Sequence, residues 1–329
     1  MKKLLCSLLV AAMVGILFAG CTTPAENSTE ERLPNLMVMS GPTGVGAAKL
    51  LADNEAAAEE DKVVTSATVV ADNAAVTSAL INGEVDIAAI ATNMAATLYQ
   101  KLDGDLQVLA VNTMGVLYIL EKGNAVSSME DLRGKTLYAT GQGANPEYIL
   151  NYLLRSAGVE PSEVDIQWMT AQEITAQMTT AEEAICMLPV PAVTALMIKD
   201  TGVRQAISLS EVWDSLGNGA LAQGCIVARR SYVEENPQAV ADFLAGYASS
   251  ITFMRAEENR AQAAELVAQY GITANAAIAA KAIPQCNLTF VTGQEMKDML
   301  LSFLTVMWEA NPASIGGALP KDDFYYGVA

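Results

Sequence analysis

The 329-residue sequence contains no histidine. This excludes a histidine general base, a Ser-His-Asp triad and histidine metal ligands. The five cysteines are scattered and show no metal-ligand spacing. Basic residues are also scarce, with 19 Lys and Arg against 37 Asp and Glu, and the formal charge of −18 would repel nucleic acid and anionic membrane surfaces. We therefore expect no catalytic residue, no metal, no cofactor and no nucleic-acid partner.

Long apolar runs are absent except at the N-terminus. Two lysines precede an uncharged stretch from Leu4 to Gly20 that leads directly into Cys21, as in bacterial lipoprotein signals. The pattern predicts a signal peptide over residues 1–20, lipidation of Cys21 and a protein anchored on the outer side of the cell membrane. The polar residues that follow predict a flexible tether over residues 21–33. An uncleaved anchor, or an ordinary export signal with an incidental cysteine, is the alternative.

Three cysteines remain beyond the signal and the predicted lipidation site: Cys186, Cys225 and Cys286. An odd number cannot be paired completely within one chain. A disulfide between Cys225 and Cys286 is compatible with export. Three inert, buried thiols are the alternative.

An internal repeat organises the rest of the chain. VTSALINGEVDIAAIATNMAATLYQK from Val76 aligns without a gap to ITAQMTTAEEAICMLPVPAVTALMIK from Ile174, 98 residues later. Each copy predicts a helix, an acidic turn, a buried strand and a second helix. Upstream, the strand LMVMS before GPTGVGAAKLL and the strand TLYAT before GQGANPEYILNYLL form a second pair at about the same offset. Chance similarity of βα units is the alternative, but two concordant pairs favour a duplicated α/β lobe.

Two such lobes would face each other across a cleft. Ligands of doubly wound sheets bind beyond the carboxyl ends of the strands, where helix N-termini present free N–H groups. We predict that the four strand-to-helix loops of the repeat contact a ligand through Ser40, Gly41, Pro42, Thr43, Gly44, Thr92, Asn93, Met94, Gln142, Gly143, Ala144, Asn145, Pro189 and Val190. These loops carry hydroxyl, amide and backbone groups but no Arg or Lys, which favours a small polar or heteroaromatic solute, neutral or with one anionic group.

The loop GQGANP allows a second interpretation. Asn145 followed by Pro146 is also typical of an N-cap and a first helical residue, so the asparagine could serve the helix rather than a ligand. Neither this loop nor GPTGVG matches the Walker phosphate loop or the dinucleotide fingerprint.

Several segments carry a family resemblance. They are GPTGVGAAKL, NGEVDIAAIATNMAATLYQ, NTMGVLYIL, SMEDLRGKTLYATGQGANPEYILNYLL, LPVPAVT, AQGCIVARRSYVEENPQAVADFL and NPASIGGALPKDDFYY. In this order, from about Leu36 to Tyr326, they resemble the nitrate, sulfonate, taurine and pyrimidine-precursor (NMT1/SsuA-like) group of ABC-importer binding proteins.

The resemblance implies a type II periplasmic-binding-protein fold, an α/β architecture of two doubly wound lobes. Lobe 1 would comprise residues 34–122 and 226–329, and lobe 2 residues 123–225. It also implies a protein that binds a small molecule for an ABC permease. We predict a monomer whose lobes close about hinges near residues 121–128 and 223–227. Many relatives have Pro-Glu-Pro where this chain has Pro189-Val190-Pro191, so the identity of the ligand does not carry over.

Two other classes of function fit the same sequence. An exported sensory or scaffold lipoprotein would bind a ligand without transport. An enzyme on this fold would need an acid or a base in the cleft, and the export signal and the lack of histidine argue against it.

Overall fold

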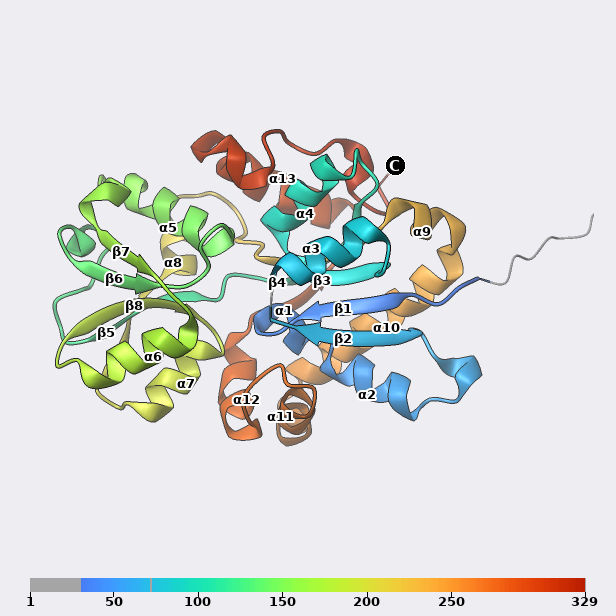
Figure 1. The fold of residues 1–329 in the computed structure, drawn as a ribbon, viewed down its shortest axis with the longest axis horizontal. Helices are drawn as coiled ribbons and strands as arrows, with labels where there is room; N and C mark the ends of the chain where they lie inside the picture. Colours follow the sequence, from blue (N-terminus) through green and yellow to red (C-terminus); the bar gives the residue numbers. More distant parts are fainter. Residues whose placement is uncertain (1–30, 72, 329) are drawn as a thin grey trace, which may run out of the picture. The chain divides into compact units, whose positions relative to one another are not determined.

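The computed structural model describes residues 31–71 and 73–328, in which two β-sheets form (Figure 1). The first sheet has the strand order β11-β4-β10-β3-β1-β2, and the second has the order β7-β6-β8-β5-β9. The strands of the first sheet are β1 (Asn35–Met39), β2 (Ser66–Val70), β3 (Ile87–Ala91), β4 (Gln107–Thr113), β10 (Gly224–Ala228) and β11 (Leu288–Val291). Those of the second are β5 (Leu117–Lys122), β6 (Thr136–Ala139), β7 (Asp165–Trp168), β8 (Ala184–Pro189) and β9 (Val203–Ser208).

Helices cover both faces of each sheet (Figure 1). Those of the first lobe are α1 (Pro42–Val45), α2 (Ala48–Ala56), α3 (Asn73–Asn82), α4 (Thr92–Lys101), α9 (Arg230–Glu235), α10 (Pro237–Arg255), α11 (Arg260–Gln269), α12 (Ala276–Ala282) and α13 (Gly293–Ala310). The second lobe contains α5 (Asn145–Ser156), α6 (Ala171–Thr180), α7 (Ala192–Lys199) and α8 (Leu209–Ser215). Short 3-10 turns include η6 (Pro312–Ile315), which packs beside α4 and α13.

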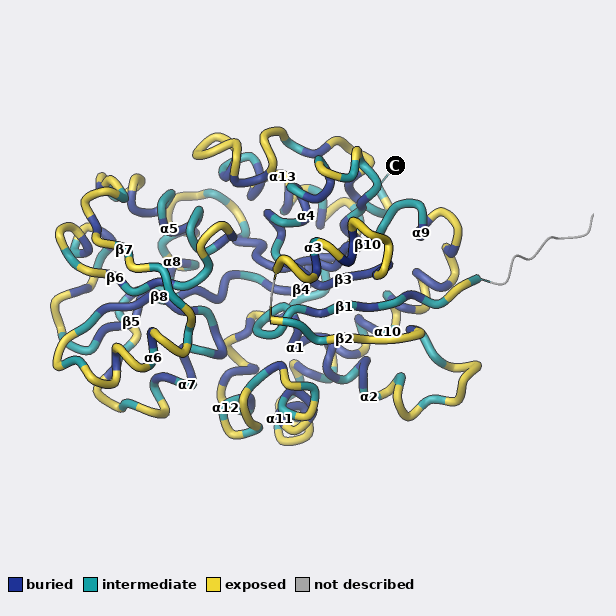
Figure 2. Tube along the Cα trace, in the orientation of Figure 1, coloured by how far each residue is buried: buried dark blue, intermediate teal, exposed yellow. Residues whose placement is uncertain are grey.

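The internal repeat is a repeat of topology. In the first copy β1 pairs in parallel with β2 and β3, and in the second copy β6 pairs in parallel with β7 and β8. An antiparallel strand follows at the same place in each sheet, since β10 pairs with β3 and β5 pairs with β8. The aligned segments form α3-β3-α4 and α6-β8-α7, as the sequence predicted. Figure 2 shows that burial is concentrated along the strands, whereas the edge strand β2 is largely exposed.

Both predicted lobe boundaries require correction. Residues 117–122 were assigned to lobe 1, but they form β5, which pairs with β8 and β9 of the second sheet. The first crossover is therefore residues 114–116, and the return crossover, residues 216–223, ends where β10 begins at Gly224. The apolar run VLYIL suits a buried strand of either sheet, so its sequence does not reveal which strands it pairs with.

The end of the predicted tether is bound to the folded body. The Arg32 guanidinium donates two hydrogen bonds to the Asp86 carboxylate, at 2.7 and 2.6 Å. The backbone N–H of Ala239 donates to Glu31 Oε2 at 2.7 Å. Residues 31–33 are thus not part of a free tether, because a bidentate ion pair onto a buried carboxylate fixes them. The predicted signal peptide, Cys21 and the rest of the tether lie outside the described residues.

Within residues 31–71 and 73–328, none of the helices is long and apolar enough to cross a membrane.

Candidate ligand-binding site

The loop from Ser40 to Gly44 is fixed against the strand ends of the first sheet. Gly41 adopts φ 94°, a conformation that favours glycine. A Cβ on Gly44 would lie 2.2 Å from the carbonyl oxygen of Met39, so this position also requires glycine. The carbonyl oxygen of Thr43 accepts a hydrogen bond from Asn112 Nδ2 at 3.0 Å. The loop therefore has a defined position next to the end of β4.

The second loop begins α4 and is buried. The backbone N–H of Thr92 donates to the carbonyl oxygen of Gln223 at 3.2 Å, and Thr92 Oγ1 donates to the carbonyl oxygen of Ala222 at 2.7 Å. Asn93 Nδ2 donates to the carbonyl oxygen of Ser314 at 3.2 Å. Met94 is half-buried and packs against the apolar core.

Asn145 of the third loop contacts the first lobe. Its Nδ2 donates to Thr92 Oγ1 and to the carbonyl oxygen of Gln223, both at 3.0 Å. The alternative that Asn145 is an N-cap is wrong: Ala144 holds that position and α5 begins at Asn145. The Nδ2 group of Asn145 is therefore engaged by Thr92 of the first lobe and by Gln223 of the return crossover. Gln142 and Gly143 are exposed at the same loop.

The fourth loop approaches the first crossover. The backbone N–H of Val190 donates to the carbonyl oxygen of Val116 at 3.0 Å, and the Val190–Pro191 peptide bond is cis. The Val190 side chain is fully buried, while Pro189 is half-buried. The predicted contact of Val190 with a ligand would therefore have to come from its backbone.

Gln223 links the two crossovers and was not among the predicted site residues. Its Oε1 accepts a hydrogen bond from the backbone N–H of Val116 at 2.6 Å. Its own N–H donates to the carbonyl oxygen of Thr113 at 3.0 Å, and its carbonyl oxygen accepts from Thr92 and Asn145. The sequence places Gln223 at a predicted hinge. Nothing in the pattern indicates that its side chain bonds to Val116 or that its backbone carbonyl oxygen accepts hydrogen bonds from both lobes.

A cavity of about 410 Å³ lies where α4 meets the start of α5. Residues of both lobes line it, including three predicted site residues: Asn93, Met94 and Gly143. Polar side chains that the sequence analysis did not select also line it: Thr77, Ser78, Thr97, Lys101, Tyr148 and Ser314. Most lie one or more turns into helices, and helical periodicity alone does not show which polar face meets another lobe. The loops at residues 40–44 and 189–190 do not line this cavity.

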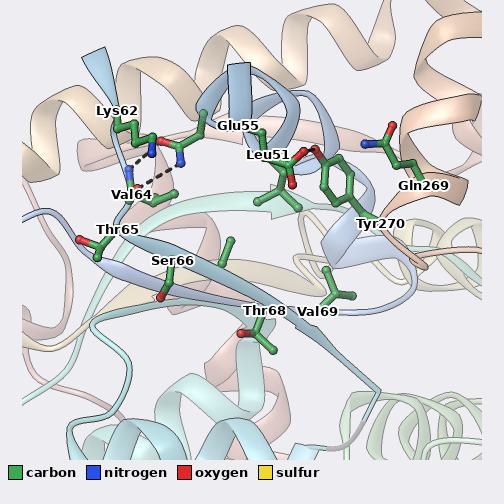
Figure 3. Close-up of a pocket in the computed structure, with 12 residues that line it drawn as sticks. Leu51, Glu55, Lys62, Val64, Thr65, Ser66, Thr68, Val69, Gln269 and Tyr270 are labelled. Atoms are coloured by element: carbon green, nitrogen blue, oxygen red, sulfur yellow. Dashed lines mark hydrogen bonds between the residues drawn. The ribbon is translucent and has the colours of Figure 1, made fainter. Parts of the chain in front are cut away.

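A larger hollow of about 660 Å³ lies along the edge strand β2 (Figure 3). Its walls come from α2, β2 and the end of α11, and Tyr270 donates a hydrogen bond to Glu55 there at 2.8 Å. All of these elements belong to the first lobe, and no predicted site residue lines the hollow. We therefore place the candidate site in the smaller cavity, which has walls from both lobes.

The three cysteines of the described chain are free and buried. The Cys225 to Cys286 disulfide, one of two alternatives from the sequence, is therefore not formed, and buried thiols are found instead. Burial raises the pKa of Cys186 and of Cys286 to about 12, because a thiolate would be desolvated there. In residues 31–71 and 73–328, no group of three or more Cys, Asp or Glu is placed to hold a metal ion.

These thiols lead to a prediction about alkaline pH. Between the usual pKa of 9.0 and the folded value of about 12, the unfolded state loses the thiol protons and the folded state keeps them. The contribution to stability is therefore complete below pH 9.0 and is lost as the pH rises toward 12. We expect the urea midpoint to fall over this range.

We also expect Ellman's reagent to label the mature chain carrying Cys21→Ser only after denaturant is added. Rapid labelling of the native chain would contradict the buried placement of the thiols.

One family model and several solved structures match this chain. Residues 106–261 match the family model described as NMT1/THI5 like. The match confirms the family resemblance inferred from the sequence motifs. A comparison with curated proteins returned no match.

Solved structures extend the likeness to most of the chain. An ABC transporter protein from Parabacteroides distasonis is 24% identical with a TM-score of 0.74, over 90% of this chain and 99% of that one. The periplasmic aliphatic sulphonate binding protein SsuA from Escherichia coli is 18% identical with a TM-score of 0.71, over 89% and 96%. The periplasmic nitrate-binding protein NrtA from Synechocystis is 15% identical with a TM-score of 0.54, over 73% and 66%. The fold is the type II periplasmic-binding-protein fold, as predicted.

Proposed function

We propose that this chain is an extracytoplasmic binding protein, anchored by a lipid at Cys21, that captures a small polar solute between its lobes and delivers it to an ABC permease. The observation that carries the proposal is the cavity of about 410 Å³ lined by polar side chains of both lobes. The similar proteins named for sulphonate and nitrate binding support the same role. The motifs of the N-terminus support export and anchoring.

Closure of the lobes would use the two crossovers. Within residues 31–71 and 73–328, the chain passes between the sheets at residues 114–116 and 216–223, and a hydrogen bond of Gln223 joins these segments. A solute that contacts both α4 and α5 would favour the closed arrangement, because it interacts with both walls only when they approach. The permease would then recognise the closed form. We propose binding without catalysis, since the sequence has no histidine and the cavity is lined largely by hydroxyl and amide groups.

A thermal-shift screen of the mature chain tests the proposal. The panel comprises amino acids, aminopyrimidines, alkanesulfonates, nitrate and riboflavin-like compounds. A binder at a hundredfold excess over its Kd should raise the Tm by roughly 4–8 °C, because it stabilises only the folded state. Recovery of the compound unchanged after incubation would support binding alone, and product formation would indicate an enzyme.

A cavity-filling variant locates the site. Thr97→Trp places a large ring into the inter-lobe cavity and should remove the thermal shift. Thr252→Trp is the control, because Thr252 is exposed on α10 and does not line the cavity. An unchanged shift in Thr97→Trp would place the ligand elsewhere.

A further inference from the structure

The orientation of the Asn93 side-chain amide is fixed by its neighbour. Nδ2 lies 3.2 Å from the carbonyl oxygen of Ser314, and a carbonyl can only accept a hydrogen bond. The NH₂ group must therefore face Ser314, and Oδ1 must face the other way. Asn93 is only 2% exposed, and its Oδ1 has no hydrogen-bond donor among the described residues. The residue lines the inter-lobe cavity.

The Asn145 side chain, at the start of α5, is also fixed in orientation, although Asn145 does not line the cavity. Its Nδ2 donates to the carbonyl oxygen of Gln223 and to Thr92 Oγ1. The hydroxyl hydrogen of Thr92 is already donated to Ala222, so Thr92 can only accept from Asn145. The Asn145 amide is thus also fixed in orientation. Its Oδ1 is buried and has no donor within the described part of the chain.

Two buried amide oxygens without donors lie in the first turns of α4 and α5, which meet at the cavity. Buried acceptors are nearly always paired, because an unpaired one loses its hydrogen bonds to water without replacement. A solute with N–H or O–H groups in the cavity would supply the missing donor at Asn93. Nitrate and a simple alkanesulfonate present only acceptor oxygens and would leave Asn93 Oδ1 unpaired.

We propose that the solute donates hydrogen bonds through N–H or O–H groups and that Asn93 Oδ1 is one of its acceptors. The inference rests on the proposed function and specifies the ligand class of the same site. It distinguishes this chain from binders of anions that offer acceptor oxygens alone. Asn93 is then a specificity-determining residue.

Isothermal titration with matched pairs of probes tests the inference. The pairs are alanine with propionate, taurine with ethanesulfonate, and an aminopyrimidine with its dimethylamino counterpart, and nitrate is added as an acceptor-only anion. We expect at least one donor-bearing member to bind on the order of tenfold to a hundredfold more tightly than its partner. Nitrate or ethanesulfonate binding as tightly as the donor-bearing probes would overturn the inference and would indicate recognition of negative charge, for which Lys101 lines the same cavity.

Variants of Asn93 identify the acceptor. Asn93→Leu removes Oδ1 with little change in volume. It should weaken the binding of the donor-bearing probe about tenfold or more and leave the affinity for the matched probe without the donor unchanged. Asn93→Asp keeps an acceptor oxygen and should retain the preference for the donor-bearing probe. The Tm of each variant, measured without probe, shows whether it folds normally. Asn151→Leu is the matched control, because Asn151 Oδ1 is also buried and unpaired but does not line the cavity.

The outcomes separate this inference from the proposed function. If probes bind but show no preference for donors, or if Asn93→Leu binds the donor-bearing probe normally, the inference is wrong and solute binding stands. If no probe binds, solute binding in this cavity fails and the inference fails with it.

Discussion

Gly224→Ala is expected to lower the free energy of unfolding by about 1–3 kcal/mol. A Cβ at this position would lie 2.4 Å from Thr43 Cγ2, 2.8 Å from Asn112 Oδ1 and 2.9 Å from Thr113 Cβ. These atoms belong to the first predicted loop and to the end of β4, so relief of the overlap must displace one of them. Gly224 also begins β10, where the chain returns to the first sheet.

Urea denaturation measures this loss of stability. Gly202→Ala is a suitable control, because the nearest atom to its added Cβ is Asp200 Oδ1 at 3.2 Å, the end of a side chain that can move. Equal stability of the Gly224 and Gly202 variants would show that the contact between Thr43 and β10 is looser than the structure indicates.

Gln223→Leu is expected to destabilise the fold by about 1–3 kcal/mol, the usual cost of leaving a buried donor unpaired. The lost acceptor, Oε1, is 2.6 Å from the backbone nitrogen of Val116, and Val116 is only 2% exposed. Because this bond joins the two crossovers, the variant should also change the equilibrium between open and closed lobes.

Gln223→Glu is the informative companion, since it keeps an acceptor oxygen in the same place. It should retain more of the stability than Gln223→Leu. Small-angle scattering with and without a bound probe would report the change in closure. If the leucine variant matches the parent in urea midpoint and in scattering, the bond does not control the crossovers.

The candidate site combines chemistry that was visible in the sequence with contacts that were not. Asn93, Met94 and Gly143 were predicted from loops at the carboxyl ends of repeated strands, and they line one cavity. Thr97 and Tyr148 line it as well but lie within helices, where a polar residue usually faces water. Whether such a residue faces water or another lobe depends on how the lobes pack, which no local pattern specifies.

The role of Asn145 shows the same limit. Asparagine before proline is favoured at helix starts for local reasons, and the local interpretation assigns the side chain to its own helix. In the structure the amide bonds to Thr92 and Gln223 instead. Partners that are distant in sequence compete with local ones, and only the folded chain decides between them.

The sequence by itself determined the duplicated βα units, the parallel pairing within each copy and the lack of histidine chemistry. Periodicity and composition are local properties, so they indicate the secondary structure of a segment independently of where that segment lies in the fold. The tertiary structure alone decided that β5 joins the second sheet, that residues 31–33 dock on the body, and that the Asn93 amide oxygen lies buried without a donor among the described residues. Each of these depends on which distant groups meet, because pairing and burial are properties of the assembled chain.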